Sequence, residues 1–183
     1  AGHDIVRIHR LAALEGLALT MAFAAYSLLQ CGANLATVDA LIERALALNP
    51  GSSVVRYCSV WSYVFACRPE AAFAECEMGL RLDPRSAWRL ALTLGQGLSL
   101  LHLRRFAEAI PLLYKGIMDA QRALTVRMIA SCYGHLGRLQ EARAVPGGFA
   151  PPSPTELRWR SLFRDGSFQA ILDEGLALAA GDA

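Results

Sequence analysis

Apolar residues recur along this chain at spacings of three and four, the pattern of amphipathic helices, and short polar turns separate the apolar segments. Two of these segments end alike: residues 42–50 read IERALALNP and residues 76–84 read CEMGLRLDP. Pro84 follows Pro50 by 34 residues. Because proline disfavours a helical conformation in the residue before it, each segment is predicted as a helix that ends at this Asn-Pro or Asp-Pro step.

A second landmark repeats further along the chain. Residues 105–109 read RFAEA, and residues 138–142, 33 positions later, read RLQEA. The alanine at the end of each motif lets two antiparallel helices approach closely. The pattern therefore predicts helical hairpins, whose helices are expected over residues 19–30 and 35–48, 53–65 and 69–82, 87–101 and 106–118, and 124–135 with a partner from 139.

The two ends of the chain differ from these units. A helix over residues 4–14 is expected to close the first hairpin, and residues 147–154 (GGFAPPSP) are predicted as a loop. Residues 153–156 (SPTE) form a capping box that starts a short helix to about residue 163, and a last helix is expected to about residue 180. The expected division is a helical repeat array over residues 1–146 and a loop with C-terminal capping helices over residues 147–183.

A period of about 34 residues with two helices per unit resembles the tetratricopeptide repeat (TPR) family. The small and large positions of that family's consensus coincide here with Val60, Tyr63, Ala72, Cys76, Gly79 and Pro84, with Gly97, Leu100, Ala109, Leu113 and Gly116, and with Ala130, Tyr133 and Ala142. The first unit departs from it, with Tyr26 and Val38 where small residues are usual. The resemblance covers residues 17–145. It implies an all-α fold, a right-handed α-solenoid of about four TPR-like hairpins with a C-terminal helical cap.

A narrower resemblance concerns the end of the chain. Repeats followed by residues 162–165 (LFRD) and 172–176 (LDEGL) look like the C-terminal regions of bacterial class III adenylate/guanylate cyclases and of related winged-helix regulators. That resemblance implies a docking or regulatory part of a bacterial signalling protein. The alternative is a structural spacer, or the dimerisation arm of a winged-helix transcriptional regulator.

In a solenoid of this kind the first helix of each hairpin lines the concave side. Tyr57, Trp61 and Phe65 follow one another at spacings of four and so make one stripe on a helix. The stripe is either core or an apolar groove for a helix or an extended peptide, and both interpretations remain open. The expected partner-binding groove consists of Phe23, Tyr57, Trp61, Phe65, Leu94, Leu98 and Arg127.

The expected partner is a protein or peptide, either an apolar helix or extended segment or a second copy of the chain in a homodimer. A clamp on a C-terminal carboxylate, the best-known ligand mode of such repeats, needs basic residues on successive first helices. Only Arg56 and Arg127 stand at suitable positions, so this mode is not expected.

Composition narrows the function classes. Of the 183 residues 54% are hydrophobic and 19% charged, which excludes a disordered chain. The 18 basic against 16 acidic residues leave a net charge of +2, so no nucleic-acid partner is expected.

Candidate chemistry is sparse. The five cysteines include no CxxC pair, and their odd number argues against a disulfide framework, which fits a reducing cytoplasm. The four histidines form no metal-binding spacing, and neither nucleotide-binding nor hydrolase motifs occur. Cys132 and His135 share a helix face without an evident orienting third group. The chain is therefore expected to be neither an enzyme nor a cofactor-binding protein.

Residues 16–38 contain no charged side chain and so resemble a membrane span in length. Polar residues crowd the second half, and neither a basic flank nor an aromatic belt is present. A helix of a stacked array is the preferred interpretation, with no membrane contact and a cytoplasmic location. Residues 1–4 do not have the pattern of a signal peptide.

Overall fold

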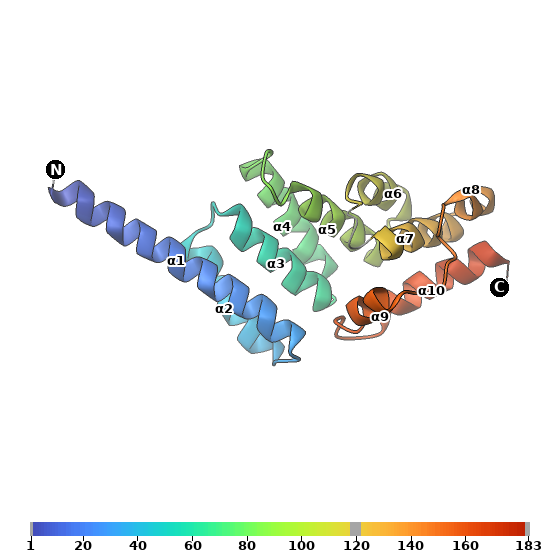
Figure 1. The fold of residues 1–183 in the computed structure, drawn as a ribbon, viewed down its shortest axis with the longest axis horizontal. Coiled ribbons are helices and arrows are strands. Elements are labelled where there is room, and N and C mark those ends of the chain that lie inside the picture. The colour runs from blue at the N-terminus through green and yellow to red at the C-terminus, as the bar shows by residue number, and fades with distance from the viewer. Residues whose placement is uncertain (1, 118–121, 182–183) are drawn as a thin grey trace.

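The computed structural model describes residues 2–117 and 122–181, and their side chains from residue 13 onward. Every regular element in these residues is a helix, which confirms the all-α class (Figure 1). The helices are α1 (Gly2–Gln30), α2 (Leu35–Leu48), α3 (Ser53–Phe65), α4 (Pro69–Leu82), α5 (Arg89–His102), α6 (Phe106–Lys115), α7 (Arg122–His135), α8 (Leu139–Ala144), α9 (Pro154–Arg160) and α10 (Ser167–Ala180).

Local signals explain the boundaries that agree with the sequence. Helices α2, α3 and α4 have the predicted bounds. Asn34 and Ser52 cap the first two, because their side chains accept hydrogen bonds from Ala36 N (2.8 Å) and Val55 N (3.3 Å). Pro69 stands in the first turn of α4, where its missing N–H costs nothing.

The prediction of two separate helices before residue 30 is wrong, because α1 is a single helix of 29 residues. Gly16 lies in its middle, and the Thr20 hydroxyl donates to the Gly16 carbonyl (2.9 Å). A lone glycine weakens a helix by about 1 kcal/mol and does not end it. Other boundaries differ slightly: α5 begins at Arg89, α6 ends at Lys115, α7 begins at Arg122 and α9 ends at Arg160. Residue 118, the predicted end of α6, lies outside the described residues.

Successive helices pack on one another along the chain. Helix α1 contacts α2 and α3, α3 contacts α4 and α5, α5 contacts α6, and α6 contacts α7. Ala72, Ala109 and Ala142, each near the start of the second helix of a pair, are fully buried. A Cβ on Gly116 would lie 2.7 Å from Leu94 Cα, so this contact excludes a side chain. The result is an elongated molecule with its termini at opposite ends (Figure 1).

The face of α1 that meets α2 and α3 is made of small and apolar residues, Ala18, Ala22, Ala25 and Leu29, all buried. Its other faces expose Leu17, Phe23 and Leu28. The segment Ala13–Gln30 is long and apolar enough to cross a membrane, and 22% of it is buried in the structure.

The C-terminal segment turns back along the molecule. Helix α10 packs against α7, and also contacts α8 and α5. The backbone N–H of Arg164, between α9 and α10, donates to the carbonyl of Phe65 at the end of α3 (2.9 Å). Residues 154–181 therefore lie beside α3, α5 and α7.

Candidate functional site

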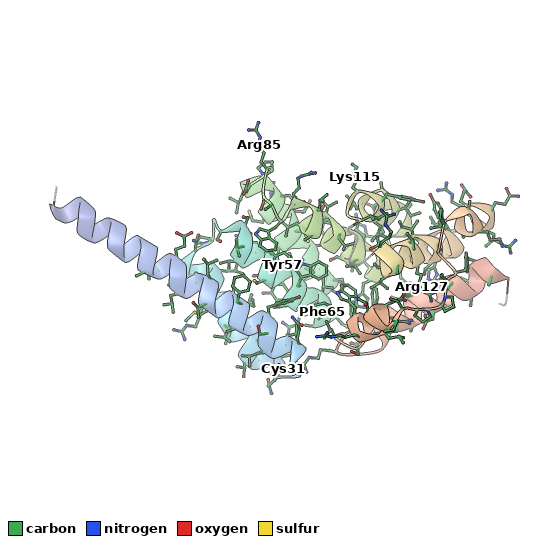
Figure 2. The ribbon with its side chains drawn as sticks, in the orientation of Figure 1. Cys31, Tyr57, Phe65, Arg85, Lys115 and Arg127 are labelled. Atoms are coloured by element: carbon green, nitrogen blue, oxygen red, sulfur yellow. The ribbon has the colours of Figure 1, made fainter. Side chains whose placement is uncertain are left out.

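The candidate site is the face of α3, α5 and α7 that the C-terminal segment covers, here called the inner face and defined by Trp61, Phe65, Leu98 and Arg127. On α3 the ring centroids of Trp61 and Phe65 are 5.8 Å apart, and Tyr57 continues the stripe 6.3 Å from Trp61. Figure 2 shows Tyr57 and Phe65 on α3 and Arg127 further toward the C-terminal helices.

Two aromatic rings from the C-terminal segment lie on the inner face. The Trp159 ring on α9 meets Trp61 and Phe65 edge-on, at centroid distances of 5.7 and 5.2 Å. Phe163 meets Phe65 edge-on at 5.4 Å and stacks on Phe168 of α10 at 4.2 Å. Edge-to-face contacts of this kind add to the free energy of burial.

These rings fill the space between the helices. The cavity that remains there has a volume of only about 10 Å³, and its lining includes Val64, Leu98, Phe163 and Phe168. Trp61 and Phe65 are consequently 5% and 0% exposed. In this structure the chain's own C-terminal segment occupies the inner face.

A buried ion pair joins α7 to α9. Arg127 Nε lies 3.0 Å from Glu156 Oε1, and Glu156 is 3% exposed. The Nε–H does not point at the carboxylate, so this N–H and both Glu156 oxygens lack a hydrogen bond among the described residues. Arg127 Nη1 instead donates to the carbonyl of Ala150. The contact is therefore an ion pair without a hydrogen bond. Because both groups are buried, their desolvation costs free energy that such a pair does not fully offset.

The predicted capping box is formed in part. The Ser153 hydroxyl accepts from Glu156 N (3.1 Å), as expected. The Glu156 side chain lies toward Arg127 instead, and no reciprocal bond to the cap is formed.

The structure brings four of the seven predicted groove residues together: Trp61, Phe65, Leu98 and Arg127 make up the inner face. Tyr57 lies at its edge, half-buried, with its ring 4.2 Å from Trp88 and 6.4 Å from Tyr26. Leu94 is buried elsewhere on α5, against Gly116 at the end of α6. Phe23 is 45% exposed on α1.

Sequence reasoning missed Tyr26, Trp88, Trp159 and Phe163 as members of this aromatic group. Trp159 and Phe163 are four residues apart, the spacing at which two rings share a helix face, so that signal was present. No helical spacing indicated Trp88, because this residue stands in the turn before α5. There Ser86 Oγ accepts a hydrogen bond from the Trp88 backbone N–H (3.2 Å).

Arg164 fastens the C-terminal segment to the first pair of helices. Its guanidinium donates to the carbonyls of Gly32 (3.5 Å) and Ala33, in the turn after α1. Carbonyls at helix C-terminal ends attract cations. One residue thus ties the loop before α10 to the ends of α1 and α3.

A polar cluster lies beside this tie. Ser167 Oγ donates to Asp165 Oδ1 (2.5 Å) and lies 2.8 Å from His102 Nε2. The single hydroxyl proton of Ser167 is engaged in the hydrogen bond to Asp165. In the second bond His102 Nε2 is therefore the donor and Ser167 Oγ the acceptor. This is the reverse of the arrangement in which a histidine takes a hydroxyl proton for nucleophilic attack.

Electrostatics in the cluster follow from burial and hydrogen bonding. Burial lowers the pKa of His102 from its usual 6.5, against the opposing pull of Asp165. The hydrogen bonds from the Ser167 side chain and backbone lower the pKa of Asp165. Burial raises the pKa of the Cys67 thiol, which keeps it protonated near neutral pH.

The other candidate nucleophile and metal ligands are dispersed. Burial raises the pKa of the Cys132 thiol to about 12. His135 lies with Nε2 2.8 Å from the Ile171 carbonyl of α10 and stacks on Phe106 at 4.1 Å. Within residues 13–117 and 122–181, no three His, Cys, Asp or Glu side chains gather where they could hold a metal ion.

The inner face is therefore the candidate functional site of the described residues. No protein-family model matches the chain, and neither a curated protein nor a solved structure matches it.

Proposed function

We propose that this chain is a non-catalytic protein–protein interaction module, built as a right-handed α-solenoid of about four TPR-like hairpins with a C-terminal helical cap. The packing of successive helices supports this, as does the burial of Ala72, Ala109 and Ala142 at the repeated small positions. Each pair of helices then covers the apolar face of its neighbour.

One observation carries the proposed binding role: the inner face already holds a short helix. Helix α9 rests there through the Trp159 ring and the Glu156 carboxylate, against Trp61, Phe65 and Arg127. An apolar face with one buried cation is suited to an amphipathic helix with an acidic residue.

The proposed setting is the docking or regulatory part of a bacterial signalling protein of the cyclase-like kind, in the cytoplasm. Its partner is a protein or peptide, with no role for nucleic acid, membrane or cofactor. The alternative, a dimerisation arm of a winged-helix regulator, is supported by Leu17, Phe23 and Leu28, which α1 exposes in a segment without charge.

Selection of helical peptides on the folded chain tests the binding role. Tyr57→Ala changes the edge of the inner face, and Tyr114→Ala removes a ring that is 47% exposed on α6 and serves as the matched control. Enriched peptides should bind Tyr57→Ala at least about tenfold more weakly and Tyr114→Ala as they bind wild type. Failure to enrich any helix, or equal loss in both variants, would contradict the proposal.

A further inference from the structure

We infer that α9 competes with the partner for the inner face, and that the partner is a helix presenting a carboxylate, an aromatic ring three positions later and a second ring four positions after that. Glu156, Trp159 and Phe163 have this spacing. The inference rests on the proposed function, because it names the chemistry of the partner at that same face.

The ring contacts indicate what the face selects. Trp159 and Phe163 both meet the Phe65 ring edge-on, so that one fully buried ring of α3 is bounded by two rings of the segment. The chain stays helix-like as far as Phe163, whose N–H donates to the Arg160 carbonyl (3.3 Å). Positions three and four apart therefore share one face of the bound segment.

The contact between Arg127 and Glu156 indicates why a partner helix can displace α9 from the inner face. Arg127 is 9% exposed and needs an anion, yet its Nε–H is not aligned with Glu156. A buried carboxylate without hydrogen bonds is held less well than one bound by two parallel N–H groups. A partner helix that places its carboxylate in line with the guanidinium forms the bonds that α9 lacks.

The packing of the two C-terminal helices allows α9 to dissociate from the inner face while α10 remains bound to α7. Helix α10 is held on α7 by the close approach of Gly134 and Gly175, and by the His135 contact to the Ile171 carbonyl. The backbone of α9, by contrast, approaches the other helices at isolated points only. Loops of residues 145–153 and 161–166 flank it on either side.

The other ties of α9 lie at its C-terminal end. Arg160 pairs with Asp173 of α10 (2.7 Å), whose side chain is 57% exposed, and Gln169 Nε2 donates to the Arg160 carbonyl (2.6 Å). These contacts keep the segment attached to α10 when its rings leave the inner face. A tether of this length holds α9 at an effective concentration of about 1 mM.

The test uses a labelled peptide of residues 152–165 (PSPTELRWRSLFRD) and fluorescence anisotropy. The hosts are the full chain and its Trp159→Ala/Phe163→Ala variant, in which the rings of the competitor are removed. A tethered competitor at about 1 mM weakens a peptide of about 0.1 mM affinity roughly tenfold. We therefore expect the variant to bind the peptide about tenfold more tightly than wild type does.

Matched peptides test the chemistry of recognition. The peptide with Trp159→Ala and Phe163→Ala should not bind the variant host, and the peptide with Glu156→Gln should bind several-fold more weakly. Equal affinity for both hosts, no binding to a folded variant, or equal binding of the ring-less peptide overturns the inference. None of these results affects peptides selected by the preceding experiment, so the proposed function is tested separately.

Hydrogen exchange on the wild-type chain gives a second readout if the variant host does not fold. Excess peptide should raise the exchange of amides in residues 154–163 by at least about threefold, while amides of α10 keep their rates. Unchanged exchange over residues 154–163 at a saturating peptide concentration overturns the inference.

Discussion

Gly134 and Gly175 face each other where α7 crosses α10, and neither position has room for a side chain. A Cβ on Gly134 would lie 2.9 Å from the Gly175 carbonyl carbon and 3.0 Å from Ala179 Cβ, and one on Gly175 would lie 2.5 Å from the Ser131 carbonyl oxygen. The two helices meet backbone to backbone, so the C-terminal helix is held by shape as much as by apolar burial.

This crossing predicts that Gly175→Ala destabilises the chain although alanine favours helices. Overpacking against backbone outweighs the gain in helix propensity, for a net loss of about 2 kcal/mol in the free energy of unfolding. Gly16→Ala, in open space within α1, is the matched control and should gain about 0.5 to 1 kcal/mol. Urea unfolding measures both, and equal effects of the two substitutions would refute the described crossing.

The ion pair between α7 and α9 predicts strong coupling between its members. Arg127→Met leaves the buried Glu156 carboxylate with only the more distant Arg160 Nη1, 4.0 Å away, and should cost about 3 kcal/mol of unfolding free energy. Glu156→Leu should cost less in the Arg127→Met background than in wild type, with a coupling energy of about 1 to 3 kcal/mol. A double-mutant cycle measures this, and a coupling energy near zero would mean that the two side chains are apart in solution.

Helix bounds were predictable where the stop and start signals are local. The steps at Pro50 and Pro84 and the caps at Asn34 and Ser52 each act within about four residues, so α2, α3 and α4 agree with expectation. The single helix α1 was not foreseen: helices were expected over residues 4–14 and 19–30, whereas Gly16 is an interior residue of one continuous helix.

The occupation of the inner face could not be predicted in this way. It depends on Trp159 and Phe163 reaching Phe65, about a hundred residues earlier in the chain, and on the Arg164 contacts with the turn after α1. Helical periodicity placed Trp61 and Phe65 on a common face correctly, but it contains no information about which segment covers that face.

The pKa of His102 predicts a pH dependence of stability. Its pKa in the folded chain lies below the usual 6.5, so the unfolded chain binds a proton more readily. The stabilising contribution is then complete above pH 6.5 and is lost as the pH falls below that value. His102→Gln keeps a donor toward Ser167 and does not titrate, so its urea midpoint should fall less between pH 7.5 and pH 5.5 than that of wild type. A larger fall in the variant would contradict the assigned direction.

Thiol reactivity should separate the cysteines by burial. Cys31 is exposed, Cys67 half-buried, and Cys58, Cys76 and Cys132 buried, with the pKa of Cys58 raised to about 12 by burial. A chromogenic disulfide reagent at pH 8 should label Cys31 within seconds and the three buried thiols only after denaturant is added. Rapid labelling of Cys132 in the native protein would contradict the packing of α10 on α7.

Hydrogen exchange in wild type and in the Trp159→Ala/Phe163→Ala variant tests most directly whether the inner face of α3 is a helix-binding surface that α9 occupies. Removal of the two rings should speed exchange at amides 61–65 at least about tenfold, while amides 128–135 of α7 and those of α10 keep their rates. Unchanged rates in α3 would show that α9 does not rest there. Acceleration of the whole chain together would show that α9 belongs to one indivisible core.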